Sequence, residues 1–349
     1  MKKHEDGMFS RIPVEKAVGK VLSHDVTEIR PGEFKGAAFK KGHRIAEADV
    51  CHLQRLGKRH IYVLEVPDGC LHEDDAAVAM AEAFAGPGVG WSGEPREGKI
   101  RLAATRDGLL YVDPDALFDI NLLGEVMCAT RHTRTVVATG DVVAATRAIP
   151  LVVEKRVVDL AVNIAAGAGG LLRVAEMRKP KAGAVITGNE VYTGLIEDRF
   201  EPVLRRKIDR FGGTCVGVAF APDDPEDIAG QVRGLLDRGA DLILTTGGMS
   251  VDPDDTTRAG IQRAGAGEFV YGSAVLPGAM FMLAHVGDVP VLGVPACGIF
   301  HETTVLDLIL PRVLAGERIT REDIARLGHG GMCLDCPECR FPDCPFGKG

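Results

Sequence analysis

The stretch Leu242-Ile-Leu-Thr-Thr-Gly-Gly-Met-Ser-Val-Asp-Pro-Asp-Asp-Thr-Thr257 decides the fold of the C-terminal half of this chain. Its apolar run ends at Thr246, two glycines follow, and Asp255 opens a helical pattern. This order predicts a buried strand, a tight glycine turn and a capped helix start. Glycines let backbone amides approach a ligand closely, and the N-terminus of a helix favours anions. The stretch therefore predicts a ligand-binding turn.

The same alternation of strand and helix extends on both sides of that stretch. Apolar runs predict strands at 184–187, 214–220, 241–246 and 290–294. Helical patterns are expected at about 196–211 and 225–238, from near Asp255, and at about 299–314. Strands and helices that alternate at this spacing indicate βαβ units and a parallel sheet with helices on both faces. The fold class is therefore α/β, with a three-layer parallel-sheet domain over residues 179–316.

The rest of the chain divides into three further segments. Residues 1–66 form an N-terminal segment, in which a helix at 42–57 leads into a strand at 60–66. Residues 67–178 are β-rich, beginning with a helix from His72 and ending with a helix at about 156–166. Between these helices the pattern is strand-like, and Asp107-Gly108 and Gly140-Asp141 predict hairpin turns. Residues 317–349 form a Cys-rich tail.

Composition limits the classes of function. The 349 residues carry a formal net charge of −8, and a nucleic-acid-binding surface would need a basic face. The first residues lack the apolar core of a signal peptide, and the most apolar window, 160–172, is too short to span a bilayer. We therefore expect a cytoplasmic protein that binds neither nucleic acid nor membrane.

Polar residues follow each predicted strand of the sheet. Because open parallel sheets bind ligands at the carboxyl ends of their strands, these residues predict one shared pocket. Simpler structural roles stay open: Asn189 and Asp223 as turn formers, Asp255 as a helix N-cap with Thr256 and Thr257 as alternates. The residues are Thr187, Gly188, Asn189, Glu190, Asp223, Asp224, Thr246, Gly247, Gly248, Ser250, Asp255 and Pro295.

The spacing Gly-Gly-x-Ser-x4-Asp-x-Thr, from Gly247 to Thr257, resembles the molybdopterin-binding domain of molybdenum-cofactor biosynthesis proteins. The surrounding sequence is similar to the molybdopterin molybdenumtransferase family over about 14–66 and 180–316. Thr187-Gly-Asn-Glu190 is similar to the family's Thr-Gly-Asp-Glu-like turn, and Asp223-Asp224 to its acidic turn. The N-terminal stretches 18–26 and 42–57 also resemble the family's opening.

The resemblance implies insertion of molybdate into adenylated molybdopterin, with release of AMP and a divalent cation, expected to be Mg²⁺. By the same resemblance, Glu190, Asp224 and Asp255 would be catalytic, positioning pterin, metal or molybdate. The residues that would bind the cofactor are Thr187, Gly188, Asn189, Asp223, Thr246, Gly247, Gly248, Ser250 and Pro295. The family also implies a homodimer.

Three departures from the family pattern keep other functions open. Lys40 stands where the family has an aspartate, Ala279 stands where it has a lysine, and Pro295-Ala-Cys-Gly298 replaces its Pro-Gly-Asn-Pro turn. One alternative is a non-catalytic molybdopterin carrier or insertion chaperone that serves a molybdoenzyme client. The other is a nucleotide pyrophosphatase of the competence-damage type, which has a similar Gly-Gly-containing domain.

The tail contains a Cys-x2-Cys-x2-Cys-x4-Cys pattern made by Cys333, Cys336, Cys339 and Cys344. Four thiols this close together in a reducing compartment predict a metal site. The spacing resembles the bacterial ferredoxin run without matching it, so an iron–sulfur cluster and zinc are both open. A reduced, flexible tail is the structural alternative. Redox sensing, sulfur handling or docking to a metalloenzyme are the functions that a metal-bound tail would serve.

Overall fold

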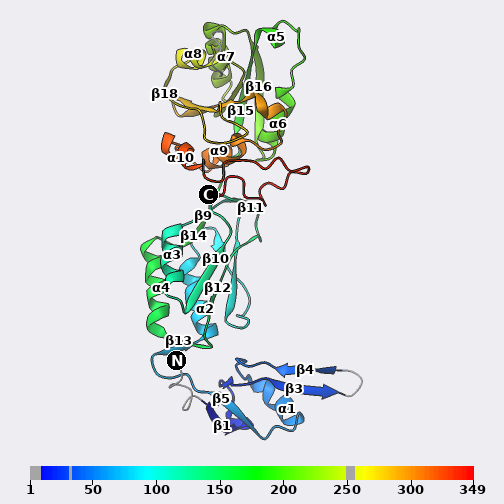
Figure 1. The fold of residues 1–349 in the computed structure, drawn as a ribbon, viewed down its shortest axis with the longest axis vertical. Helices are drawn as coiled ribbons and strands as arrows, with labels where there is room; N and C mark the ends of the chain where they lie inside the picture. The colour runs from blue at the N-terminus through cyan, green and yellow to red at the C-terminus, as the bar shows by residue number, and fades with distance from the viewer. Residues whose placement is uncertain (1–8, 31–33, 249–255) are drawn as a thin grey trace. The chain divides into compact units, whose positions relative to one another are not determined.

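The computed structural model describes residues 9–30, 34–248 and 256–349. The chain divides into two compact units (Figure 1), one made of residues 1–106, 111–131 and 139–174, the other of residues 107–110, 132–138 and 175–349. Within the described ranges, none of the helices combines the length and the apolar character needed to cross a bilayer.

The N-terminal part of the first unit is a small mixed fold. A three-stranded antiparallel sheet has the order β1-β5-β2, and β3 and β4 form a separate antiparallel pair. Leu53 of α1 is fully buried in a core with Leu22, Ile61 and Val63. The elements are β1 (Phe9–Pro13), η1 (Val14–Lys16), β2 (Val21–Leu22), β3 (Val26–Arg30), β4 (Phe34–Phe39), α1 (Glu47–Arg55) and β5 (His60–Leu64).

The middle of the chain is rich in short strands. A four-stranded sheet has the order β10-β12-β8-β7, and helix α2 packs against β12 and against α4. The elements are β6 (Cys70–His72), α2 (Glu73–Phe84), β7 (Val89–Gly90), β8 (Lys99–Ala104), β9 (Gly108–Val112), α3 (Pro114–Leu122), β10 (Val126–Thr130), β11 (Val136–Val137), β12 (Val142–Ala148), β13 (Val152–Glu154), α4 (Lys155–Gly167) and β14 (Leu172–Ala175).

Both hairpins predicted in this part are wrong. Strand β8 ends before Asp107 and β9 begins at Gly108, but β8 pairs with β12 and β9 pairs with β11. Strands β11 and β12, on either side of Gly140-Asp141, likewise pair with other strands and not with each other. The turn residues are present, yet the apolar faces of the strands find long-range partners instead, as pairing in a packed sheet favours. Helix α3 was also not predicted, although Asp113 caps it by accepting bonds from two backbone amides and Pro114 occupies its first turn.

The second unit is built around a six-stranded sheet of order β16-β15-β17-β20-β19-β18. The four predicted strands are its parallel part, whereas β19 and β18 add an antiparallel edge that was not predicted. The elements are β15 (Lys181–Thr187), α5 (Asn189–Tyr192), α6 (Phe200–Asp209), β16 (Thr214–Ala221), α7 (Pro225–Asp237), β17 (Leu242–Thr246), α8 (Thr257–Arg263), β18 (Ala266–Tyr271), β19 (Met282–Val286), β20 (Val289–Val294), η2 (Ala296–Ile299), α9 (Val305–Leu314) and α10 (Arg321–Arg326).

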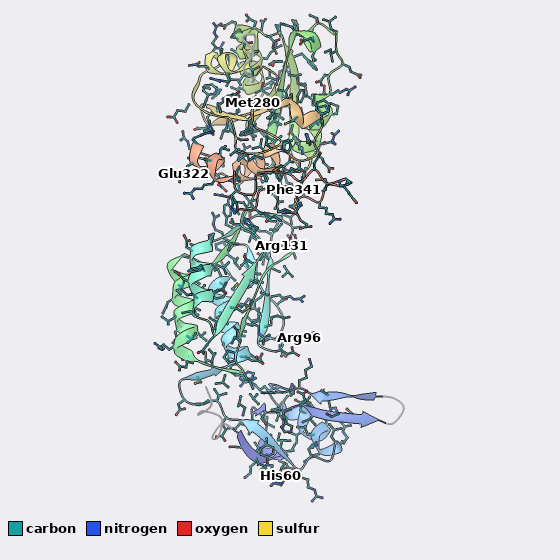
Figure 2. The ribbon with its side chains drawn as sticks, viewed as in Figure 1. His60, Arg96, Arg131, Met280, Glu322 and Phe341 are labelled. Atoms are coloured by element: carbon teal, nitrogen blue, oxygen red, sulfur yellow. The ribbon has the colours of Figure 1, made fainter. Side chains whose placement is uncertain are left out.

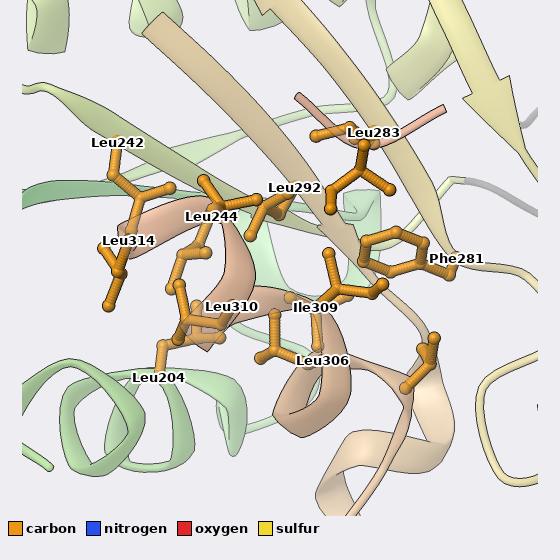
Figure 3. Close-up of a cluster of buried hydrophobic side chains, with 14 of the residues drawn as sticks. Leu204, Leu242, Leu244, Phe281, Leu283, Leu292, Leu306, Ile309, Leu310 and Leu314 are labelled. Atoms are coloured by element: carbon orange, nitrogen blue, oxygen red, sulfur yellow. The ribbon is translucent and has the colours of Figure 1, made fainter. Parts of the chain in front are cut away.

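Two apolar cores cover the two faces of this sheet, which confirms the predicted three-layer α/β fold. One core joins the sheet to α6 and α9 (Figure 3), and Ile309 and Phe281 are fully buried in it. The other joins the sheet to α7 and α8 through residues such as Ile228 and Ile261. Each fully buried side chain of this size contributes roughly 1.5–3 kcal/mol to folding.

The single helix predicted over 299–314 is wrong. The chain forms η2, leaves helical geometry over 300–304, and then begins α9. Thr304 starts the new helix, because its hydroxyl accepts from the Leu306 amide and its own amide donates to the Asp307 carboxylate. In the intervening loop Phe300 and Glu302 are exposed, whereas Thr303 is buried.

Candidate functional site

The carboxyl ends of the four parallel strands lie at one edge of the sheet. Thr187 at the end of β15 pairs in register with Ala221 of β16, and Ile186 pairs with Thr246 of β17. Thr246 in turn pairs with Val294, the last residue of β20. The described residues predicted for the pocket follow these strand ends, so the fold brings them to the same edge. Ser250 and Asp255 lie outside the described residues.

Two threonines, Thr187 and Thr257, leave no space for a side chain at either glycine of the turn. The Thr187 hydroxyl donates to the carbonyl of Thr246 over 2.7 Å and lies 2.9 Å from the hydroxyl of Thr257. A Cβ on Gly247 would collide with the Thr187 carbonyl, and one on Gly248 would collide with the Thr257 hydroxyl. Both glycines also have φ values in the left-handed region, +78° and +50°. The turn therefore requires glycine at both positions.

Buried hydroxyls without partners lie at the same edge. Among the residues that the structure describes, the hydroxyls of Thr245, Thr246 and Thr256 are buried and make no hydrogen bond. A buried polar group left unsatisfied costs about 1–3 kcal/mol. Such groups at a strand end are the kind that a polar ligand satisfies.

Asn189 and Asp223 join two of the loops to each other. The backbone amide of Asn189 donates to the Asp223 carboxylate over 2.9 Å, and the backbone amide of Asp223 donates to the Asn189 side-chain oxygen over 3.1 Å. This reciprocal pair fixes the loop after β15 against the loop after β16. This clamp between two loops differs from the local turn-forming role that the sequence left open for both residues.

The acidic residues of the edge are placed differently from one another. Asp224 is the N-cap of α7, where its carboxylate accepts from the amides of Glu226 and Asp227. Glu190 is exposed on the short helix α5, beside Gly188. Pro295 is buried and begins the turn η2 after β20. Of the two carboxylates, that of Asp224 caps a helix, whereas that of Glu190 is exposed to solvent and caps none.

Sequence reasoning missed the position of Thr257. The sequence predicts only an alternative helix cap at Thr257, whereas the structure places this residue, fully buried, in the first turn of α8 with its hydroxyl against Thr187. The N-cap position belongs to Thr256, whose side chain makes no capping bond. The adjacent pair Thr256-Thr257 was the available signal, because two hydroxyls after an acidic pair exceed what one cap needs.

The four tail cysteines lie away from the sheet edge, in a separate cavity. Cys333, Cys336, Cys339 and Cys344 line a single cavity and are all free thiols. None of the residues predicted for the sheet edge lines that cavity. Across the described ranges 9–30, 34–248 and 256–349, no group of three or more His, Cys, Asp or Glu side chains is arranged to hold a metal ion.

Two family models match the chain. Residues 183–315 match the probable molybdopterin binding domain, and residues 11–65 match a domain of unknown function (DUF8806). A CinA-like protein of Mycobacterium sp. (strain MCS) is 39% identical over 83 residues, which is 24% of this chain and 20% of the relative. The chain thus spans about a fifth of the length of the curated relatives it matches.

Solved structures with weak overall similarity include two molybdopterin biosynthesis proteins. MoaB of Thermus thermophilus is 22% identical with a TM-score of 0.33, covering 40% of this chain and 99% of that one. The MoeA protein of Pyrococcus horikosii is 15% identical with a TM-score of 0.33, covering 88% of this chain and 75% of that one. The match to the domain model, together with the geometry of the sheet edge, assigns residues 183–315 to a family. Residues 183–315 are a divergent member of the probable molybdopterin binding domain family.

Proposed function

We propose that the chain binds molybdopterin or its adenylated form at the sheet edge made by β16, β15, β17 and β20, as a carrier in molybdenum-cofactor biosynthesis. The observation that carries the proposal is the turn Gly247-Gly248, packed against threonines beside buried hydroxyls that lack partners in the described part of the chain. Such a turn offers backbone amides and hydroxyls, which bind the phosphate and polar ring atoms of a pterin.

Two acidic residues of the edge make structural hydrogen bonds, and this favours the carrier role over insertion of molybdate. Asp223 bonds to the loop of Asn189, and Asp224 caps α7. A catalytic carboxylate has to be available to a metal or to the reacting oxygen. Of the described acidic residues predicted for this edge, Glu190 is the one whose carboxylate has no such structural role. The departures at Lys40 and Ala279 agree with a site that binds its ligand without turnover.

A titration calorimetry experiment tests binding. The full chain is titrated with adenylated molybdopterin and with molybdopterin, and AMP release is followed with magnesium, with and without molybdate. The carrier role predicts saturable binding of one ligand or both, without AMP release. Glu190→Gln should change the affinity, whereas Glu322→Gln, an exposed glutamate on α10 labelled in Figure 2, should not.

The other outcomes separate the alternative functions. AMP release that depends on molybdate would establish the transferase, with Glu190 and Asp255 as its acidic residues. AMP release from a simple dinucleotide without molybdate would establish a pyrophosphatase. Absence of binding to either pterin would overturn the proposal.

A further inference from the structure

The second unit contains a small cavity with a strongly cationic lining. We call it the arginine cavity, and its volume is about 40 Å³. Its walls come from the loop 133–136, the end of α6, helix α9 and the end of the tail. The cationic residues of the lining are Arg134, Arg210, Arg312 and Lys348, and the acidic residue is Asp307. Because like charges repel, cations gathered around one small space call for a negative partner.

Arg312 brings a buried guanidinium to this cavity. Its Nε and Nη2 donate to the Glu317 carboxylate over 2.9 and 2.7 Å, and Nη2 also donates to Asp323 over 2.6 Å. Within the described ranges, Nη1 is buried and makes no hydrogen bond. The guanidinium is planar, so Nη1 lies on the side opposite the fork that faces Glu317. Since neither Glu317 nor Asp323 lines the cavity, Nη1 is the part of Arg312 with donors left for a ligand there.

Arg134 is held in the lining by a strained backbone. Its φ of +62° lies in the left-handed region, although it is not a glycine, and its backbone amide donates to the carbonyl of Leu110 over 2.6 Å. Its Nη2 lies 3.6 Å from the Asp323 carboxylate and 3.8 Å from that of Glu317, beyond hydrogen-bond distance. Strained residues of this kind are frequent at ligand-binding sites. Arg134 therefore also has donors available to a ligand of the cavity.

The charges around the cavity do not balance. Asp307 pairs with Lys207, with Nζ and Oδ1 2.6 Å apart, and the Nη1 of Arg210 lies 3.9 Å from the same oxygen. With Lys207, five cationic side chains meet here, whereas the carboxylates paired with them in the described part of the chain are Asp307, Glu317 and Asp323. Two positive charges are therefore left over. A water would bond to the Arg312 Nη1 but leave this charge, whereas an anion satisfies both.

The size and the apolar part of the lining restrict which anion fits. One water needs at least about 10–15 Å³ of such space, so the cavity holds about three waters or one small ion. Pockets for ligands as large as a pterin or a nucleotide measure roughly 300 Å³ or more. Leu308, Phe341 (labelled in Figure 2) and the buried Phe346 also line the cavity, and apolar walls strengthen the attraction between opposite charges. These features favour a small inorganic anion.

We propose that the arginine cavity binds a small tetrahedral oxyanion, inorganic phosphate, which accepts hydrogen bonds from Arg312, Arg134 and Arg210. Guanidinium groups match the oxygens of phosphate in geometry, and a dianion offsets the two positive charges left over. The bound ion would join the loop 133–136 to α9 and to the tail, since all three line the cavity. The inference does not rest on the proposed pterin binding, because no residue predicted for the sheet edge lines this cavity.

The test is equilibrium dialysis of the full chain against radiolabelled inorganic phosphate. The expected result is saturable binding of about one phosphate per chain, with a rise in Tm as the phosphate concentration increases. Arg134→Gln should weaken binding at least about tenfold and reduce the rise in Tm, because it removes a charged donor. Arg326→Gln is the matched control, since Arg326 is an exposed arginine of the same unit outside the cavity, and it should change neither result.

Competition identifies the kind of anion. Sulfate should displace the labelled phosphate, because it has the same shape, whereas chloride at the same concentration should not, because it offers a single acceptor atom.

Three results would overturn the proposal. They are absence of saturable binding, displacement of phosphate by chloride at equal concentration, and an affinity that Arg134→Gln leaves equal to that of Arg326→Gln, which would place the phosphate elsewhere. Far-ultraviolet circular dichroism of each variant establishes that it is folded. If Arg134→Gln does not fold, Arg210→Gln takes its place, because Arg210 lines the same cavity and is exposed.

Discussion

Gly247 shows at the scale of one residue how the backbone of the turn limits the sequence. Its φ of +78° lies in the left-handed region, and a side chain there would collide with the carbonyl of Thr187. We predict that Gly247→Ala lowers the free energy of unfolding by about 1–3 kcal/mol. Gly234 lies in α7 with open space around it, so Gly234→Ala should instead stabilise the chain by up to about 1 kcal/mol. Urea unfolding of both variants measures the contrast.

Asp323 is the residue whose charge links stability to pH most directly. Burial by itself would raise the pKa of Asp323, but hydrogen bonds from Thr320 and Arg312 and the Arg312 charge outweigh burial and lower the pKa to about 2. Arg312 is 1% exposed, and its Nη2 lies 2.6 Å from the Asp323 carboxylate. The ionised carboxylate therefore stabilises the folded chain at any pH above its unfolded pKa.

We predict that the unmodified chain loses unfolding free energy in acid through Asp323, and that Asp323→Asn does not show this loss. A lowered folded pKa gives stabilisation that is complete above the ordinary aspartate pKa of 3.8 and lost as the pH falls towards about 2. The difference in unfolding free energy between the unmodified chain and Asp323→Asn should shrink by about 2 kcal/mol from about pH 5 to about pH 2. A difference that stays constant over this range, measured by urea unfolding, would contradict the assignment.

At the scale of elements, Asp224 distinguishes a helix cap from a catalytic acid. Its carboxylate accepts from the amides of Glu226 and Asp227 at the start of α7. We predict that Asp224→Ala lowers the unfolding free energy by about 1 kcal/mol, and that Asp224→Asn restores most of it, because asparagine caps equally well. Pterin affinity should follow the same order. If Asp224→Asn is stable but binds pterin as poorly as Asp224→Ala, the negative charge itself serves the ligand.

The elements that could be predicted from the sequence are those with strong local patterns. The parallel strands β15, β17 and β20 are apolar runs bounded by turn residues, and such runs mark strands buried on both faces; the edge strand β16 is apolar too, but most of it is half-buried. The edge strand β18 was missed because its pattern is weak: Gly267 and Glu268 are exposed, and a bulge interrupts its pairing with β19. Edge strands are half-covered, so their sequence is less constrained.

The candidate site likewise has features that the sequence predicts and features that it does not. The positions of Thr187, Gly188 and Gly247 at one edge follow from parallel topology, which the alternation of strand and helix already implied. The Asn189–Asp223 clamp and the contact of Thr187 with Thr257 could not be predicted, because they join residues 34 and 70 positions apart. Only the packed fold determines which of two neighbouring polar side chains faces a distant loop.

On the scale of the whole molecule, the chain has separate interiors. Leu53 is fully buried in the N-terminal core of the first unit, and Ile309 is fully buried between α9 and the sheet of the second. The sheet edge belongs to the second unit. A change in the N-terminal core should therefore leave pterin binding intact if each interior is stabilised by its own contacts.

Hydrogen exchange followed by mass spectrometry tests that condition with one cavity-making substitution in each interior. We predict that Leu53→Ala and Ile309→Ala each cost about 2–5 kcal/mol, since both remove a buried aliphatic side chain. In Leu53→Ala the slow amides of β5 should exchange faster while those of β15 and β17 keep their rates, and in Ile309→Ala the pattern should reverse. Acceleration of both sets in either variant would mean that the two units unfold as one, because amides that open only in a shared transition report its full free energy.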